Sequence, residues 1–170
     1  EVPYLEDYID KHVGEWVELI RQKYISNSTD FKPMDLGRAA QYFTLDVISD
    51  VAFGHAFGDI PEDTDRFDYI KTTEDALPVM TLLSIFPGVH RWIEQSRLMD
   101  LVAPTAKDRT GLGRIVGIVQ QMVGARFNDA EKNKPDMLGS FIRHGLTQEE
   151  AESEALLQMY VTPFSFGSIC

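Results

Sequence analysis

Few residue pairs in this sequence have the types and spacing that chemistry requires. Asp46 and Asp50 stand four positions apart, so one helix face would carry two carboxylates that are able to bind a metal ion or share a proton. The same pair fits helix caps, ion pairs or a helix edge at the surface, because buried acids are rare unless they are paired. No Glu-x-x-His motif accompanies it, so a di-iron site is not predicted.

The remaining metal-binding residue types are scattered. The four histidines, His12, His55, His90 and His144, form no His-x-x-x-His pair, so the sequence predicts no zinc site and places each at the surface or in a turn. The single cysteine, Cys170, excludes an internal disulfide framework and a four-cysteine zinc site.

Nucleotide-binding and hydrolase signatures are also missing. The glycine-rich segment 111–117 resembles a dinucleotide-binding loop, but its third glycine comes one residue late and no strand precedes it. Close helix packing is the better explanation of Gly113, Gly117 and Gly124. Neither a Gly-x-Ser-x-Gly elbow nor a phosphate loop is present, so the residues assemble no complete catalytic set.

The elements that would position these side chains are predicted to be helices. Apolar residues recur at steps of three and four between charged ones, and they predict an amphipathic helix with the stripe Leu5, Ile9, Val13, Trp16 or Val17, Ile20 and Tyr24. A second helix begins after a cap at Asp35 and ends at Gly54. Its apolar residues leave little polar surface, so we expect it to be buried.

The later part of the chain continues the same pattern. Apolar residues from Phe67 to Met80 predict a third helix that kinks or restarts near Pro78 and closes at Pro87–Gly88. A shorter helical piece is predicted over 89–101. Further helices are predicted over 112–127, after a cap at Asp136, and after the Thr147–Glu150 capping box. The last one is expected to stop at Pro163. No alternating pattern supports a strand, so the fold class is all-α.

Charge and hydropathy exclude further classes. Sixteen Lys and Arg against 27 Asp and Glu give a net charge of −11, which disfavours binding to nucleic acid. The N-terminal residues form neither a signal peptide nor an anchor, and the longest apolar run is broken by Pro78, Thr81, Ser84 and Pro87, well short of the roughly 18 residues of a membrane span.

Two phrases of the sequence are similar to fungal cytochrome P450 monooxygenases. They are Met34–Gly54 (MDLGRAAQYFTLDVISDVAFG) and the segment from Asp136-Met137-Leu138-Gly139-Ser140-Phe141 to Glu154. The similarity covers about residues 1–159 and implies a partial cytochrome P450 fold, from the end of helix C or helix D to the start of helix I. The resemblance also implies that residues 77–86 enter the roof of the substrate cavity, with Leu82, Leu83 and Phe86 facing the substrate. Their spacing fits core packing equally well.

Family membership implies a heme cofactor, an apolar substrate, electrons from NADPH through cytochrome P450 reductase, and residence at the endoplasmic reticulum membrane. The resemblance implies that the chain lacks the family's heme cysteine loop, the Glu-x-x-Arg pair that stabilises the heme core, and the helix I acid and alcohol pair. Phe164 and Gly167 fit the heme loop, but Cys170 comes one residue early and is rejected as the heme ligand.

We therefore expect a partial domain over 1–159 that lacks the heme-binding C-terminal half, followed by an aberrant tail over 160–170. Alone, such a chain would bind no heme and would be inactive. The rival hypothesis is a non-enzymatic all-α binding or scaffold module.

Overall fold

The computed structural model describes residues 5–86, 88, 111–128 and 134–166, without the side chains of Met80, Leu83, Ser84 and residues 160–166. All regular elements in these ranges are helical, which confirms the predicted fold class. The predicted helical piece over 89–101 lies outside the described residues. None of the described helices is long and apolar enough to cross a membrane.

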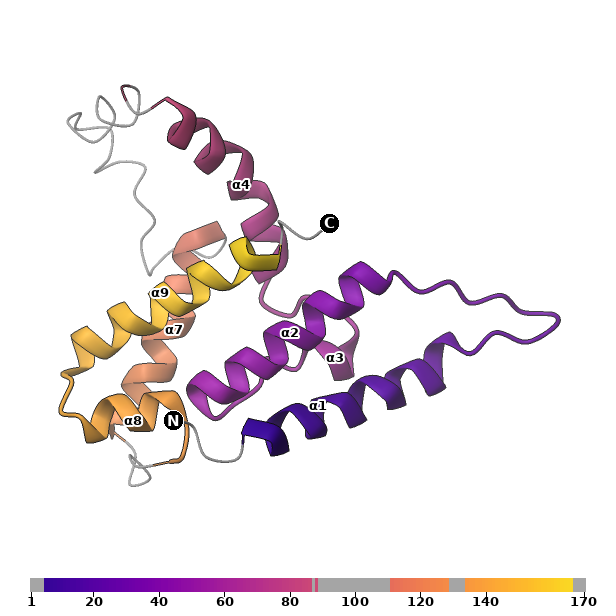
Figure 1. The fold of residues 1–170 in the computed structure, drawn as a ribbon, viewed down its shortest axis with the longest axis horizontal. Helices are drawn as coiled ribbons and strands as arrows, with labels where there is room; N and C mark the ends of the chain where they lie inside the picture. Colours follow the sequence, from indigo (N-terminus) through magenta and orange to yellow (C-terminus); the bar gives the residue numbers. More distant parts are fainter. Residues whose placement is uncertain (1–4, 87, 89–110, 129–133, 167–170) are drawn as a thin grey trace.

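The first half of the chain forms a layer of antiparallel helices (Figure 1). Helix α1 (Leu5–Leu19) continues as a π-helical turn, η1 (Ile20–Tyr24), and a long loop then leads to α2 (Leu36–Phe53). The predicted ends of α2 are confirmed: the Asp35 carboxylate accepts the Arg38 amide, and Gly54 adopts a φ of 68°. The short helix α3 (Asp59–Glu62) then packs against both α1 and α2.

The predicted burial of α2 is confirmed in only part of the helix. The C-terminal half of α2 is buried, as expected, whereas the stripe of α1 is 36 to 44% exposed at Leu5, Ile9, Val13 and Val17. The face of α1 that carries His12 and Leu19 is buried instead. Helix α2 takes this other face, where the rings of Trp16 and Phe43 stack with centroids 5.2 Å apart.

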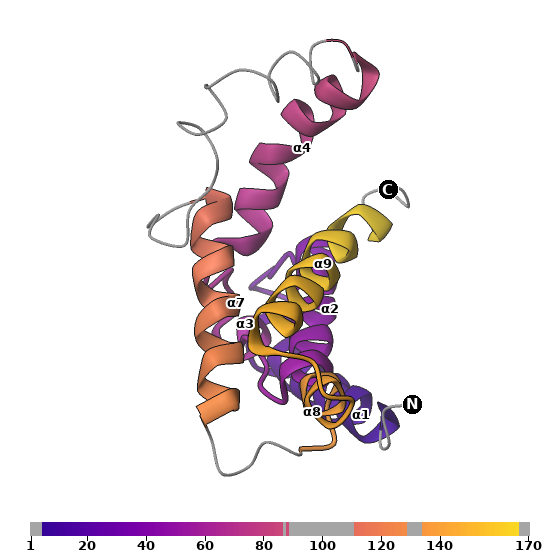
Figure 2. The same ribbon diagram turned by 90° about the vertical axis from the view of Figure 1, so that its left-hand side faces the viewer.

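The second half adds helices that cross the first layer (Figure 2). They are α4 (Tyr69–Ile85), α7 (Gly111–Asn128), α8 (Met137–Arg143) and α9 (Gln148–Phe166). Both predicted caps are present, since Asp136 accepts the Gly139 amide and Thr147 exchanges hydrogen bonds with Glu150. Pro78 does not interrupt α4, which runs unbroken to Ile85.

The predicted stop at Pro163 is wrong, because α9 continues to Phe166. A proline inside a helix removes the hydrogen bond to the carbonyl four residues earlier, which here belongs to Met159. That carbonyl accepts a hydrogen bond from the Tyr69 hydroxyl of α4 instead. The tertiary structure thus satisfies the group that a local argument leaves without a partner.

One apolar core joins the elements of both halves. Its buried residues come from α2, the segment that follows α2, and α4, α7, α8 and α9. They are Leu45, Ala52, Phe53, Phe57, Tyr69, Ile70, Ile115, Val119, Val123, Leu138, Ala151, Ala155 and Met159.

Candidate functional site

The exposed end of α4 is the candidate binding surface. Its apolar tip consists of Val79, Leu82, Ile85 and Phe86, whose side chains are 58, 58, 63 and 53% exposed. Residues three and four positions apart share a helix face, so the tip is one apolar surface. It contains Leu82 and Phe86, two of the three predicted substrate-facing residues, and neither belongs to the buried core. The side chain of Leu83 lies outside the described residues.

The opposite end of α4 is held firmly. Tyr69 and Ile70 are 4 and 6% exposed, and the Tyr69 ring meets Phe57 edge to face with centroids 6.3 Å apart. The Asp65 carboxylate accepts the amides of Tyr69 at 2.8 Å and Lys71 at 3.0 Å. A carboxylate at this end of a helix also stabilises the helix dipole. Helix α4 is therefore anchored at its base, while its apolar tip extends away from the core (Figure 1).

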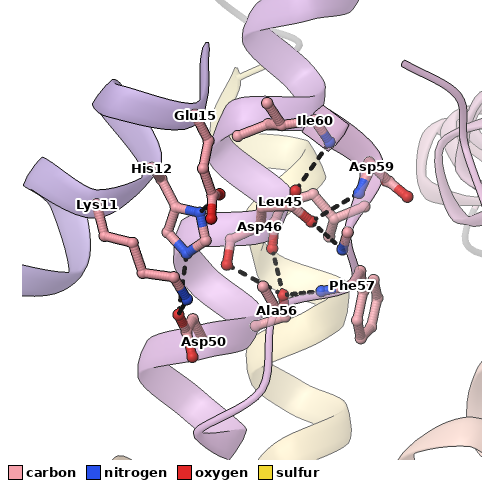
Figure 3. Close-up of polar contacts among 12 residues, drawn as sticks. Lys11, His12, Glu15, Leu45, Asp46, Asp50, Ala56, Phe57, Asp59 and Ile60 are labelled. Carbon is pink, nitrogen blue, oxygen red and sulfur yellow. Dashed lines mark hydrogen bonds and ion pairs between the residues drawn. The ribbon is translucent and has the colours of Figure 1, made fainter. Parts of the chain in front are cut away.

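The two carboxylates singled out in the sequence, Asp46 and Asp50, hold the helices of the first layer together. Asp46 is fully buried, and its oxygens accept the amides of Gly58, Asp59 and Ile60 at 2.7, 3.0 and 2.9 Å (Figure 3). These amides begin α3, so Asp46 caps a helix that is distant in sequence. Of the alternatives that the sequence left open for this residue, the helix cap is the one the structure shows, and not a helix edge at the surface.

Asp50 has different partners, all on α1. Its Oδ2 lies 2.7 Å from Lys11 Nζ and 3.0 Å from His12 Nε2, and His12 Nδ1 lies 2.7 Å from Glu15 Oε2 (Figure 3). The hydrogen bond to Asp50 raises the pKa of Lys11. His12 is fully buried, so its predicted surface position is wrong, whereas His55 and His144 are exposed as predicted. His90 lies outside the described residues.

The burial of His12 had a signal in the sequence. Tyr8, His12, Trp16 and Leu19 recur at steps of four and three, which defines a second face of α1. Burial and the charges of Asp50 and Asp136 raise the pKa of Tyr8 at the edge of this face. The predicted stripe shares only Trp16, its alternative to Val17, with this face, because a histidine adds little to a hydropathy pattern.

A third polar cluster joins α2, α7 and α8. The Arg126 guanidinium forms an ion pair with Asp136 and donates to the Phe53 carbonyl at 2.7 Å, and both charged side chains are at least 93% buried. Gly54 packs directly on this pair, since a Cβ there would lie 2.4 Å from Asp136 Oδ2. The sequence predicted the Asp136 cap but not Arg126, which lies ten residues away with no local motif.

Asp59, at the start of α3, is the buried acid with an incomplete set of partners. Its Oδ1 accepts the Arg66 amide at 3.0 Å, whereas its Oδ2 has no hydrogen-bond partner among the described residues. Burial, together with the neighbouring Asp46 charge, raises the pKa of Asp59 from 3.8 to about 7. Asp59 is therefore largely protonated in mildly acidic solution.

The metal-ligating side chain types are scattered among the described residues. Both ring nitrogens of His12 face carboxylates, and no three His, Cys, Asp or Glu side chains in the described ranges group to hold a metal ion. Cys170, rejected above as the heme ligand, lies outside these ranges. The described part of the chain therefore offers one binding surface, the apolar tip of α4. Buried polar contacts hold the helices beneath it in place.

Comparison with known proteins identifies the fold. No family model matches the sequence. The chain is 39% identical over 158 residues to cytochrome P450 monooxygenase ABA1 of Pyricularia oryzae, covering 91% of this chain and 31% of that protein. It is 35% identical over 163 residues to cytochrome P450 monooxygenase aba1 of Botryotinia fuckeliana, covering 94% of this chain and 32% of that protein.

A third relative, cytochrome P450 monooxygenase abl1 of Leptosphaeria maculans, is 29% identical over 158 residues, covering 92% of this chain and 28% of that protein. The chain thus spans about a third of the length of the curated relatives that it matches. The all-helical structure agrees with the partial cytochrome P450 fold expected from the sequence. Over more than nine-tenths of its residues, the chain is homologous to part of the fungal cytochrome P450 monooxygenases.

Proposed function

We propose that this chain forms part of a heme-dependent monooxygenase and contributes the roof of its substrate cavity. The whole protein would insert one oxygen atom of dioxygen into an apolar small molecule. Electrons would come from NADPH through a cytochrome P450 reductase at the endoplasmic reticulum membrane. The heme, when bound, supplies the oxygen chemistry, whereas the residues described here bind and orient the substrate.

The observation that carries this proposal is the apolar tip of α4. Four large apolar side chains on one helix end stay more than half exposed, although the adjoining base of the same helix is buried. Covering such side chains with an apolar ligand is favourable by about 25 cal/mol per Å² of apolar surface removed from water. A substrate with a hydrocarbon skeleton fits this surface, and Leu82 and Phe86 are the residues we expect it to contact.

A chimera tests this proposal in a complete enzyme. Residues 1–159 would replace the matching segment of the Pyricularia oryzae relative, and heme content and the spectral shift on substrate addition would be measured. We expect the chimera to bind heme through the cysteine of the recipient. Leu82→Ala and Phe86→Ala should each weaken substrate binding about tenfold, as deletion of a well-buried apolar contact does.

Matched controls separate a substrate contact from general loss of apolar surface. Leu36, the first residue of α2, and Phe31, in the loop before it, are 60 and 80% exposed and lie outside α4. Leu36→Ala and Phe31→Ala should leave the substrate affinity of the chimera unchanged. Equal losses in all four variants, or none in the α4 pair, would contradict the roof assignment. A chimera that folds but takes up no heme would contradict the broader proposal.

A further inference from the structure

The contact between Tyr69 and α9 is more specific than ordinary packing. The Tyr69 hydroxyl donates a hydrogen bond to the main-chain carbonyl of Met159, and both residues are at least 96% buried. Main-chain carbonyls inside a helix normally accept the amide four residues later. A side chain from another helix rarely finds such a carbonyl available. The availability of the Met159 carbonyl therefore needs a cause.

Pro163 supplies that cause. It lies four residues after Met159 within α9 and has no amide hydrogen, so the Met159 carbonyl lacks its intrahelical donor. A carbonyl left without a donor in the core would carry a desolvation penalty. The hydroxyl of Tyr69 removes this penalty.

We propose that Tyr69 is a positioning residue that fixes the base of α4 to α9 at the carbonyl freed by Pro163. Tyr69 is the first residue of α4, and the buried side chains among the described residues of this helix, Tyr69, Ile70 and Thr72, all lie at this end. A directional hydrogen bond at the base sets the direction in which the apolar tip points. One consequence rests on the proposed function. If α4 covers the substrate cavity, Tyr69 sets the position of α4 relative to α9.

A double-mutant cycle on the chain itself tests the contact without heme or substrate. Tyr69→Phe keeps the ring and removes the hydroxyl, while Pro163→Ala restores an amide that can donate to the Met159 carbonyl. The measurement is amide hydrogen exchange by mass spectrometry on peptides covering 69–77 and 151–159. In the parent chain, Tyr69→Phe should accelerate exchange of both peptides about tenfold, since the loss leaves a buried carbonyl unsatisfied.

In the Pro163→Ala background, the same Tyr69→Phe change should accelerate exchange less than about threefold, because the new amide replaces the hydroxyl. Tyr24→Phe is the matched control: the Tyr24 hydroxyl donates to Asp63 at 2.8 Å, away from α9. Its effect should be the same in both backgrounds. An ordinary packing role for Tyr69 would also give equal effects in both backgrounds, and that result would overturn the proposal.

The design also covers loss of folding. If Tyr69→Phe unfolds the chain and Tyr69→Phe with Pro163→Ala restores protected amides, the proposal is supported by rescue. If both variants are unfolded, Tyr69 acts through something other than this carbonyl and the proposal fails. None of these readouts involves heme, so failure here is distinct from failure of the chimera to bind heme or substrate.

Discussion

Asp59 makes the stability of the fold depend on pH. Its carboxyl group is fully buried, and its folded-state pKa of about 7 compares with 3.8 for an unperturbed aspartate. Below pH 3.8 the folded and unfolded chains both carry the proton. As the pH rises from there to about 7, the unfolded chain releases the proton while the folded chain keeps it. Stability contributed by this group is therefore lost across that interval.

The size of the loss follows from the shift. A difference of about three pKa units, at 1.36 kcal/mol each, gives a ceiling of about 4 kcal/mol. Asp59→Asn carries no charge at any of these pH values and keeps an oxygen that can accept the Arg66 amide. We expect the variant to gain about 2 to 4 kcal/mol of unfolding free energy relative to the parent between pH 4 and pH 8.

Urea unfolding followed by far-UV circular dichroism measures this change. Parent and Asp59→Asn chains would be compared at pH 4, 6 and 8, and the difference between them cancels the titration of the other carboxylates. Asp30→Asn is the control, because that side chain is 58% exposed. Curves for the parent and Asp59→Asn that stay parallel from pH 4 to pH 8 would refute the reasoning, even if the variant is uniformly less stable.

The remaining predictions concern the other buried groups and the cofactor. Asp46→Ala should lower the free energy of unfolding in urea by about 2 to 4 kcal/mol, because three amides at the start of α3 lose their acceptor. Asp35→Ala, which removes an ordinary cap, should lower it by about 1 kcal/mol. Equal losses in the two variants would contradict this. Arg126→Met should cost about 3 to 5 kcal/mol by leaving Asp136 buried without its ion pair, and a cost under about 1 kcal/mol would exclude that role. The purified chain mixed with hemin should give no thiolate-type carbon monoxide difference spectrum. A thiolate band that Cys170→Ser abolishes would reverse the rejection of that cysteine.

The sequence predicted the parts of the fold that depend on neighbouring residues. Asp35, Gly54 and Asp136 act within four residues of their own position, so their types and spacing were enough to place three helix ends. The Thr147–Glu150 box is of the same kind. Local hydrogen bonds of this sort need no knowledge of which helices pack together.

The failures all involve groups whose partners are distant in sequence. Asp46 caps a helix 12 residues later, and His12 meets Asp50 across 38 positions. A helix stop was expected at Pro163, whereas the Met159 carbonyl, four residues earlier, has a partner in Tyr69, 90 residues away in the sequence. The candidate site was likewise predictable only in part. Apolar character on α4 was visible in the sequence, but the contrast between a buried base and an exposed tip depends on what packs around it.

The polar contacts of α2 also limit the ways in which this chain can misfold. Apolar burial is non-directional, so α2 could be turned about its axis and still cover apolar surface. Asp46, Asp50 and the Phe53 carbonyl each require a partner on a different neighbour, namely α3, α1 and α7. A rotated arrangement that kept these carboxyl groups in the interior would bury them without their partners, at several kcal/mol each. These three contacts therefore discriminate against compact but wrongly packed states, a selectivity that the apolar core alone does not provide.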